Sequence, residues 1–365
     1  MTSMLRFTLL GDNTVKTSYR DQTFAALDLG TNSCRMLIAK PCKEKFRIID
    51  SFSKSVKLGS GLEETKSLSN AAMKRAISAL KICRRKLDYH KVKHMRLIAT
   101  EACRRANNSD QFILDVKRNT GLSLEIIPPS EEARLAVISC APLMDSTSEQ
   151  ILVVDIGGGS TELIWVDLKN VDPSLRQHAL SEIRPKLKGV TDNYGAEVID
   201  WISVPLGVVT LKDQYKDVDG DLAQFALMAC HFEERLAEFK PYKELLDQNF
   251  NNFQIIGTSG TVTTIGASFL NLKKYDRNLV DGLVLSTEQV LSVIQNYLNL
   301  GHLGRAKDKT IGKDRQDLIM SGSAILQTLS RLWPTNKLSI ADRGLREGLL
   351  LSLLDKNKRS DKKII

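Results

Sequence analysis

Apolar and polar positions follow two different periods along this chain, and together they predict mixed strands and helices. Short apolar runs bounded by turn residues predict strands at 24–30, 33–40, 46–53, 96–100, 124–127, 151–155, 162–166 and 253–256. Apolar positions three and four apart predict helices at 69–88, 110–119 and 130–140. Strands and helices mixed in this order predict an α/β fold.

One strand–turn–strand pattern occurs twice. Asp28-Leu-Gly-Thr-Asn-Ser33 and Asp155-Ile-Gly-Gly-Gly-Ser160 share the form Asp-x-Gly-x-x-Ser, each between two apolar runs and 127 residues apart. Repetition at domain-sized separation indicates a duplicated unit. We therefore expect two lobes that face each other across a cleft.

The repeated turns have the composition of phosphate-binding loops. Glycines let the backbone approach a ligand closely, and successive N–H groups can form a concave anion site to which hydroxyls add donors. A third glycine–hydroxyl cluster follows the strand at 253–256 and precedes an apolar helix. The predicted phosphate ligands from the three loops are Gly30, Thr31, Asn32, Ser33, Gly157, Gly158, Gly159, Ser160, Thr161, Gly257, Ser259 and Gly260.

An aspartate stands at the strand end beside each of the first two loops. A carboxylate repels phosphate but suits Mg²⁺, which bridges carboxylate and phosphate oxygens. We therefore predict a Mg²⁺ site, with Mn²⁺ as an alternative ion, at Asp28 and Asp155, supported by Glu162. The alternative is two tight hairpins whose aspartates only cap backbone N–H groups; the repetition favours the ligand site.

Composition and charge narrow the classes of protein. Apolar residues make up 42% and charged residues 26% of 365 positions, which excludes a disordered or collagen-like chain. The net charge of +9 fits a polyanionic partner or simply a solvated basic surface. Six cysteines without a CxxC pair indicate reduced thiols, mostly core residues, and no apolar stretch reads as a membrane span, so we expect a cytoplasmic protein.

Several motifs together resemble one family. Besides the two Asp-x-Gly-x-x-Ser turns, the chain carries Ala99-Thr-Glu-Ala-Cys-Arg104, Ser130-Glu-Glu-Ala-Arg-Leu135, Gly257–Thr261 and Ala341-Asp-Arg-Gly-Leu-Arg-Glu-Gly348 in the same order. Over residues 23–353 the chain resembles the exopolyphosphatase/guanosine pentaphosphate phosphohydrolase (Ppx/GppA) family of the actin–sugar kinase–Hsp70 superfamily. The resemblance implies two ribonuclease-H-like lobes in an actin-like ATPase fold.

The resemblance also implies roles for particular residues. Glu132 corresponds to the carboxylate that activates water, and Arg104 to an arginine that binds the anionic chain. The acidic residue at Glu131 is sufficiently explained by its predicted place in the first turn of a helix, where the helix dipole favours a negative charge. Arg315 and Asp317 match a family motif that we interpret as structural, so we leave them out of the predicted site. Ser259 stands where the family usually has glycine, which narrows the approach of the backbone to a ligand.

The same resemblance suggests how the chain is divided. We expect an N-terminal extension (1–22), lobe I (23–139) completed by a C-terminal helix (344–356), lobe II (140–343) and a basic disordered tail (357–365). Residues 168–198 read as an insertion without an assigned role. Longer family members continue into a helical domain that is not expected here, which predicts a more distributive enzyme unless a homodimer rebuilds a long groove.

The implied activity is a hydrolase acting on acid anhydrides, an exopolyphosphatase or guanosine-5′-triphosphate,3′-diphosphate phosphatase of the stringent response. Its partners would be inorganic polyphosphate or guanosine pentaphosphate, with no membrane and no specific nucleic acid. Two alternatives remain open: an ATP-dependent kinase of the same superfamily, and a non-catalytic sensor of alarmone or polyphosphate. A kinase would need a sugar or acid pocket, which no motif specifies, and a pure sensor would not need Glu132.

Overall fold

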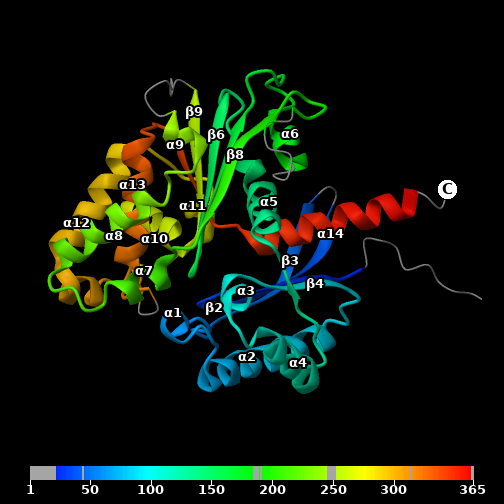
Figure 1. Cartoon of the computed structure of the whole chain (residues 1–365). Coiled ribbons are helices and arrows are strands. Elements are labelled where there is room, and N and C mark those ends of the chain that lie inside the picture. The colour runs from blue at the N-terminus through cyan, green and yellow to red at the C-terminus, as the bar shows by residue number, and fades with distance from the viewer. Residues whose placement is uncertain are drawn as a thin grey trace, which may run out of the picture.

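The computed structural model describes residues 22–42, 45–183, 189, 191–244, 252–312 and 315–362. Two β-sheets form the centres of two lobes, as the α/β prediction requires (Figure 1). Of the predicted N-terminal extension (1–22), only residue 22 lies within the described part. Among the described residues, no helix is both long enough and apolar enough to cross a membrane.

Both sheets have the same strand order, which confirms the duplicated unit. Lobe I has the order β3-β2-β1-β4-β5, and lobe II has β8-β7-β6-β9-β11 with β10 added at the β11 edge. In each lobe the first two strands form an antiparallel hairpin, and the first strand runs parallel to the strand on its other side. The strands are β1 (Phe24–Leu29), β2 (Ser33–Cys42), β3 (Lys45–Ser55), β4 (His94–Ala99), β5 (Glu125–Ile126), β6 (Gln150–Ile156), β7 (Thr161–Asp167), β8 (Glu197–Val204), β9 (Phe253–Thr258), β10 (Val284–Leu285) and β11 (Leu338–Ala341).

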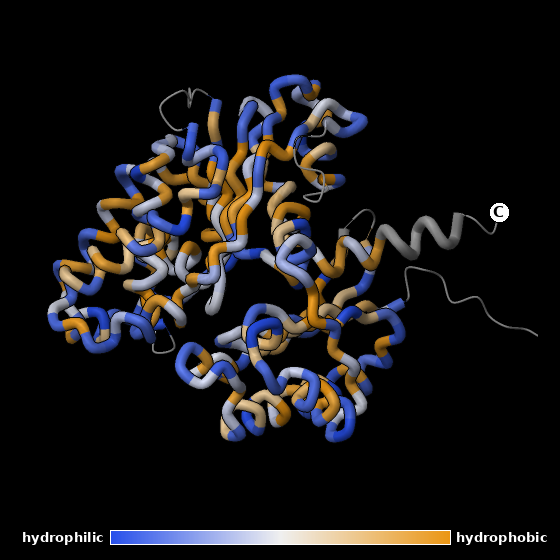
Figure 2. The backbone as a smooth tube through the Cα atoms, in the orientation of Figure 1, coloured by the Kyte–Doolittle hydropathy of each residue, from blue (hydrophilic) through white to orange (hydrophobic). Residues whose placement is uncertain are grey.

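Helices cover the outer face of each sheet and bury its apolar side chains. Figure 2 shows the hydrophobic positions gathered along the central strands and the inward sides of these helices. Lobe I carries α1 (Leu62–Thr65), α2 (Asn70–Tyr89), α3 (Glu101–Arg105) and α4 (Ser109–Thr120). Lobe II carries α7 (Val208–Gln214), α8 (Asp221–Glu234), α9 (Lys240–Lys243), α10 (Gly260–Phe269), α11 (Arg277–Val280), α12 (Thr287–Lys307) and α13 (Ile319–Leu332).

Two helices fill the space between the sheets on the side where the chain crosses from lobe to lobe. α5 (Pro129–Cys140) packs Leu135 with the inner core of lobe I and Val137 with the inner core of lobe II. α14 (Leu345–Lys362) returns from lobe II and covers the lobe I sheet with Leu349, Leu350 and Leu354. The two helices cross so closely that a Cβ at Gly348 would lie 2.2 Å from the Leu135 carbonyl oxygen.

Local signals in the sequence explain where several elements begin and end. Ser69 caps α2 by accepting a hydrogen bond from the Ala72 amide at 3.2 Å, and Gly121 ends α4 in the left-handed conformation. α14 extends to Lys362 and so includes residues 357–362 of the tail predicted at 357–365; residues 363–365 lie outside the described part. Lys and Arg are good helix formers, and the buried leucines of the preceding turns anchor the helix from which they continue.

The insertion at 168–198 has a structural function in the part that is described. It contains α6 (Arg176–Glu182) and the start of β8, and its Val171, Ala179 and Leu180 are buried with the inner core of lobe II. Residues 184–188 and 190 lie outside the described part. The prediction that most cysteines are core residues is confirmed: Cys34, Cys83, Cys103 and Cys140 are buried free thiols, whereas Cys42 and Cys230 are exposed.

Candidate active site

A cleft of about 660 Å³ lies between the lobes and is lined by all three predicted loops. The turn after β1 (Gly30–Ser33) and the turn after β6 (Gly157–Ser160) face each other across it, and residues 258–261 close one side. The first two turns have the same backbone closure: the Gly30 amide donates to the Ser33 carbonyl at 3.0 Å, and the Gly157 amide to the Ser160 carbonyl at 2.9 Å. The repeated sequence therefore folds into a repeated geometry.

The glycines of the second turn allow the two lobes to touch. A Cβ at Gly158 would lie 3.1 Å from the Thr31 Cβ, and one at Gly159 would lie 2.6 Å from the Thr31 Oγ1 and 3.0 Å from the Glu101 Cγ. Close approach of the facing loop, and not only of a ligand, thus requires glycine at these positions. Thr31 is correspondingly buried, at 5% exposure.

Four carboxyl groups gather around the cleft in surroundings that oppose their ionisation. Burial, with repulsion from Glu132 and Asp28, raises the pKa of Asp155 to about 8. Burial and repulsion from Asp155 raise the pKa of Glu162 to about 7, although hydroxyls of Ser160 and Ser203 donate to it at 2.8 and 2.7 Å. Burial also raises the pKa of Asp28, against the opposing charge of Arg35.

Glu131 and Glu132 are adjacent on α5, yet their surroundings shift their pKa values in opposite directions. Although burial opposes it, hydrogen bonds from Arg134 and Arg96 lower the pKa of Glu131 to about 2. Burial and repulsion from Glu162 raise the pKa of Glu132 well above its ordinary value. Glu131 is thus an ion-paired surface group, whereas Glu132 is a 6% exposed carboxyl that faces the cleft.

Arg104 holds Glu132 in place. Its Nη1 donates to the Glu132 Oε2 at 2.7 Å and to the Ile127 carbonyl at 2.9 Å. Its Nε and Nη2 donate to the Glu101 Oε2 at 3.1 and 2.8 Å. Every nitrogen of the guanidinium is therefore engaged by protein groups, and the side chain is not among those lining the cleft.

The third loop contains a residue in a glycine-type conformation. Ser259 has φ 152° and ψ 176°, a region that side chains with a Cβ rarely adopt. Its Oγ accepts hydrogen bonds from the amides of Thr261 and Val262 at 3.1 and 3.2 Å, which caps α10. The serine that departs from the family pattern thus caps the helix while its backbone keeps the glycine geometry.

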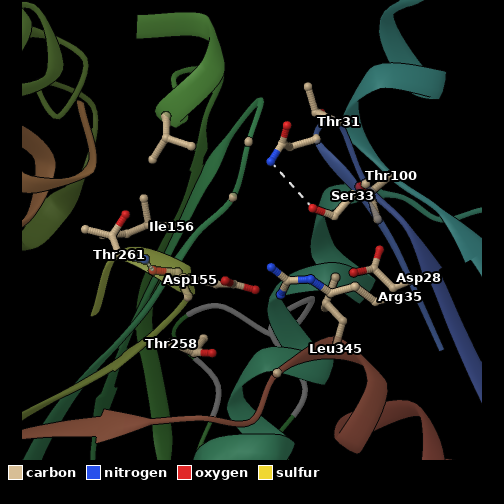
Figure 3. Close-up of a pocket in the computed structure, with 18 of the residues that line it drawn as sticks. Asp28, Thr31, Ser33, Arg35, Thr100, Asp155, Ile156, Thr258, Thr261 and Leu345 are labelled. Atoms are coloured by element: carbon tan, nitrogen blue, oxygen red, sulfur yellow. Dashed lines mark hydrogen bonds between the residues drawn. The ribbon is translucent and has the colours of Figure 1, made fainter. Parts of the chain in front are cut away.

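The structure adds cleft residues that the sequence interpretation missed. Figure 3 shows the Arg35 side chain lying between the carboxylates of Asp28 and Asp155. Arg346 from the first turn of α14 also lines the cleft, as does Glu101. The repeat contained a signal for Arg35: it lies opposite Asp28 in the hairpin register, as Glu162 lies opposite Asp155.

Arg315 lies in the cleft wall, which differs from the sequence interpretation that it is only structural. We left it out of the site, but it lines the cleft while donating to the Gly260 carbonyl at 3.0 Å and the Thr264 hydroxyl at 2.6 Å. Its bonds to the first turn of α10 make it structural, as the motif suggested, and its position also makes it part of the cleft wall. Asp317 is not among the lining residues and lies 3.7 Å from the Lys212 ammonium.

Four of the predicted site residues do not reach the cleft surface. Besides Arg104, these are Thr161, whose hydroxyl donates to the Leu206 carbonyl at 2.7 Å; Gly257, at which a Cβ would lie 3.1 Å from the Val262 Cγ1; and Glu162, which lies behind Ser160. The remaining ones line it: Gly30, Thr31, Asn32, Ser33, Gly157, Gly158, Gly159, Ser160, Ser259, Gly260, Asp28, Asp155 and Glu132.

The carboxylates of Asp28 and Asp155 suit a divalent cation whose remaining ligands come from water or substrate. The buried Asp28 Oδ1 has no hydrogen-bond partner within the described structure, and ionised oxygens of Asp28 and Asp155 are the ligand type that Mg²⁺ prefers. Across the described residues, no three Asp, Glu, His or Cys side chains converge closely enough to hold a metal by themselves. Mg²⁺ commonly keeps several waters and takes only one or two carboxylates plus substrate phosphates, and the residues present suit that mode.

Comparisons with known proteins agree with this geometry. A model of the Ppx/GppA phosphatase family matches residues 37–357. A guanosine-5′-triphosphate,3′-diphosphate pyrophosphatase of Aeromonas hydrophila is 25% identical over 341 residues, which cover 93% of this chain and 60% of the relative. The chain thus spans less than two thirds of the length of that relative.

Solved structures show the same architecture. The Ppx/GppA family member of Aquifex aeolicus is 27% identical with a TM-score of 0.71, over 92% of this chain and 98% of that one. An exopolyphosphatase from Cytophaga hutchinsonii is 23% identical with a TM-score of 0.76, over 92% and 98% of the two chains. At that lower identity the likeness concerns the fold alone.

Proposed function

The chain belongs to the Ppx/GppA phosphatase family, and we propose that it is a phosphoanhydride hydrolase. It would release the terminal phosphate of inorganic polyphosphate or the 5′-phosphate of guanosine pentaphosphate. Both substrates present a terminal phosphate joined through an anhydride oxygen, so one arrangement of groups serves both.

The observation that carries this proposal is the environment of Glu132. Its carboxyl is buried, faces the cleft and has a pKa raised well above the ordinary value by burial and by Glu162. A general base is most effective when its pKa lies near the working pH. Arg104 fixes one oxygen of Glu132 at 2.7 Å, which leaves the other oxygen to accept a proton from an attacking water.

The loops supply the other requirements of the reaction. Residues 30–33 and 157–160 line the cleft. Apart from the Gly30 and Gly157 amides, which close the two turns, their backbone amides and hydroxyls are suited to hold the terminal phosphates. Arg35, between Asp28 and Asp155, offers positive charge to the same phosphates. In this arrangement Glu132 takes the proton of the water, while the new P–O bond forms and the anhydride P–O bond breaks.

Mg²⁺ is proposed at the carboxylates of Asp28 and Asp155. The ion would supply positive charge that offsets the charge of the substrate oxygens in the transition state. Burial raises the pKa of both aspartates, so a cation bound beside them would favour their ionised forms. Glu162 would support this site indirectly, through the hydrogen bonds that the Ser160 and Ser203 hydroxyls donate to it.

Replacing Glu132 tests the assignment directly. In Glu132→Gln the side chain keeps its size and its bond to Arg104 but loses its basicity, so we expect the rate of phosphate release to fall by about 10²–10⁴ with little change in KM. Glu131→Gln is the matched control, since that residue is ion-paired away from the cleft. Phosphate release from polyphosphate and from guanosine pentaphosphate, with and without Mg²⁺, is the assay. Wild-type turnover in the Glu132 variant would contradict the proposal.

A further inference from the structure

Positive charge is distributed unevenly between the lobes. Residues 22–140 contain 22 Lys and Arg against 12 Asp and Glu, whereas residues 141–343 contain 21 against 26. The net positive charge of the chain therefore comes mainly from lobe I. A basic field on one side of a cleft steers and retains an anionic ligand there.

Within lobe I the surplus is greatest on α2. From Asn70 to Leu87 this helix has six Lys and Arg and no acidic residue. Arg84 pairs with Asp88, Lys86 pairs with Asp50, and Arg75 donates to backbone carbonyls. Three exposed cations remain without a carboxylate partner in the described part of the chain: Lys74, Lys81 and Arg85, here named the α2 ridge.

The ridge is an arrangement that folding alone does not favour. Its members are separated by seven and four residues, so they lie on one face of the helix. Lys81 and Arg85 form a like-charge i, i+4 pair, which destabilises a helix, and no acidic residue between Asn70 and Leu87 offsets their charge. An anionic ligand bound along the ridge would offset this repulsion between like charges.

The N-terminal part of α2, where the ridge begins, lies beside a segment that borders the cleft. Lys54 lines the cleft at the end of β3, and the exposed Lys57 follows it. The Arg75 guanidinium donates to the Val56 and Lys57 carbonyls at 2.8 and 3.1 Å, which fixes the second turn of α2 beside that segment. The Val56 and Lys57 amides donate in turn to the Asn32 carbonyl of the first phosphate loop at 2.9 Å.

α2 lies on the outer face of the lobe I sheet (Figure 1). Arg75 meets the chain just after β3, and Lys86 pairs with Asp50 farther back in β3, so the helix recedes from the cleft as it runs. At 1.5 Å per residue, the ridge extends over about 16 Å. Its cations are spaced at about the Debye length of physiological salt, so an extended polyanion would feel them together.

We propose that the α2 ridge is a binding track for the distal part of a long inorganic polyphosphate whose end lies in the cleft. The inference rests on the proposed function, because it takes the chain end to be the reacting group. The ligand class is a linear, flexible polyanion with charge on every unit, which needs regularly spaced cations and no base-specific contacts. The track would favour long chains over short ones without touching the reacting phosphate.

The test compares substrates of two lengths. The ridge variant carries Lys74→Gln, Lys81→Gln and Arg85→Gln, and the control variant carries Lys91→Gln, Lys93→Gln and Lys117→Gln, three exposed lysines of the same lobe. With long-chain polyphosphate we expect the ridge variant to raise KM about tenfold at unchanged kcat and to weaken the salt dependence of KM. With tripolyphosphate its KM should equal that of wild type, and the control variant should behave as wild type with both.

The possible results of this experiment distinguish the proposed binding track from the proposed hydrolase activity. Equal KM values of ridge variant and wild type for the long chain would overturn the track while leaving the hydrolase intact. If wild type cleaves neither substrate, the proposed activity fails, and binding of labelled long-chain polyphosphate to the two proteins then tests the track alone. Competition by single-stranded RNA as strong as by polyphosphate would show a general polyanion surface and overturn the assignment to polyphosphate.

Discussion

Replacing Asp155 by asparagine should stabilise the protein, and by more at high pH than at low pH. The side chain is buried, and burial with repulsion from Glu132 and Asp28 raises its pKa from 3.8 to about 8. An unfolded chain ionises this group near pH 4. Between pH 4 and pH 8 the folded protein therefore binds more protons than the unfolded one, so the contribution of Asp155 to stability falls as pH rises.

The size of the effect follows from the same two values. Each pH unit between them is worth about 1.4 kcal/mol, so from pH 5 to pH 8 the carboxyl should cost the folded state about 4 kcal/mol. Asparagine does not titrate and removes this pH-dependent cost. It also removes the repulsion that raises the pKa of Glu162.

Urea unfolding at pH 5 and pH 8 measures the difference. We expect Asp155→Asn to gain about 4 kcal/mol more relative to wild type at pH 8 than at pH 5. Asp145→Asn is the control, because the Lys337 ammonium beside Asp145 lowers its pKa to about 2 and its charge is constant over this range. A stability difference for Asp155→Asn that is the same at both pH values would refute the reasoning.

The same variant tests the metal proposal. Mg²⁺ that binds only the folded state stabilises it, and it does so most where Asp155 is ionised. At pH 8, Mg²⁺ should therefore raise the stability of wild type and narrow the gap to Asp155→Asn. In activity assays the variant should need a higher Mg²⁺ concentration. An unchanged Mg²⁺ titration in the variant would count against Asp155 as a ligand.

Three further substitutions test how the site is held. Arg104→Met should lower kcat and move the rise of activity to higher pH, because Arg104 lowers the pKa of Glu132; a pH–rate profile measures both, and an unshifted profile would contradict the positioning role. Gly159→Ala should reduce activity with the fold retained, since its Cβ would clash with the Thr31 hydroxyl at 2.6 Å; turnover and circular dichroism would show this, and full activity would disprove the tight contact. Ser259→Gly should stabilise the protein by about 1 kcal/mol, because relief of φ 152° outweighs the small loss of the cap; thermal unfolding checks the sign.

The sequence predicts the fold well because its evidence is local and repeated. The two Asp-x-Gly-x-x-Ser turns lie between apolar runs, and each became a hairpin with the same closing hydrogen bond. Ser69 and Gly121 mark helix ends through caps that depend only on neighbouring residues. The anchoring of the first turns of α14 on the lobe I sheet, by contrast, is a tertiary effect that no local pattern shows.

The site was predicted less completely, for a different physical reason. Loop glycines and strand-end aspartates are visible in a motif, but the engagement of a side chain by distant residues is not. Arg104 reads as a free cation in sequence, whereas Glu101, Glu132 and Ile127 occupy its donors in the structure. Arg346 reaches the cleft only because the chain crosses back from lobe II into lobe I.

The hairpin register gives the cleft a polarity that its architecture alone would lack. Two copies of one folding unit related by approximate symmetry would present identical faces to a ligand between them. Here the residue opposite the strand-end aspartate is Arg35 in one copy and Glu162 in the other, so the copies differ in charge sign at the same register position. Because Arg35 lines the cleft while Glu162 lies behind Ser160, a ligand between the lobes would meet two different surfaces. Divergence at this pair of positions therefore contributes an asymmetry that the repeated architecture alone would not provide.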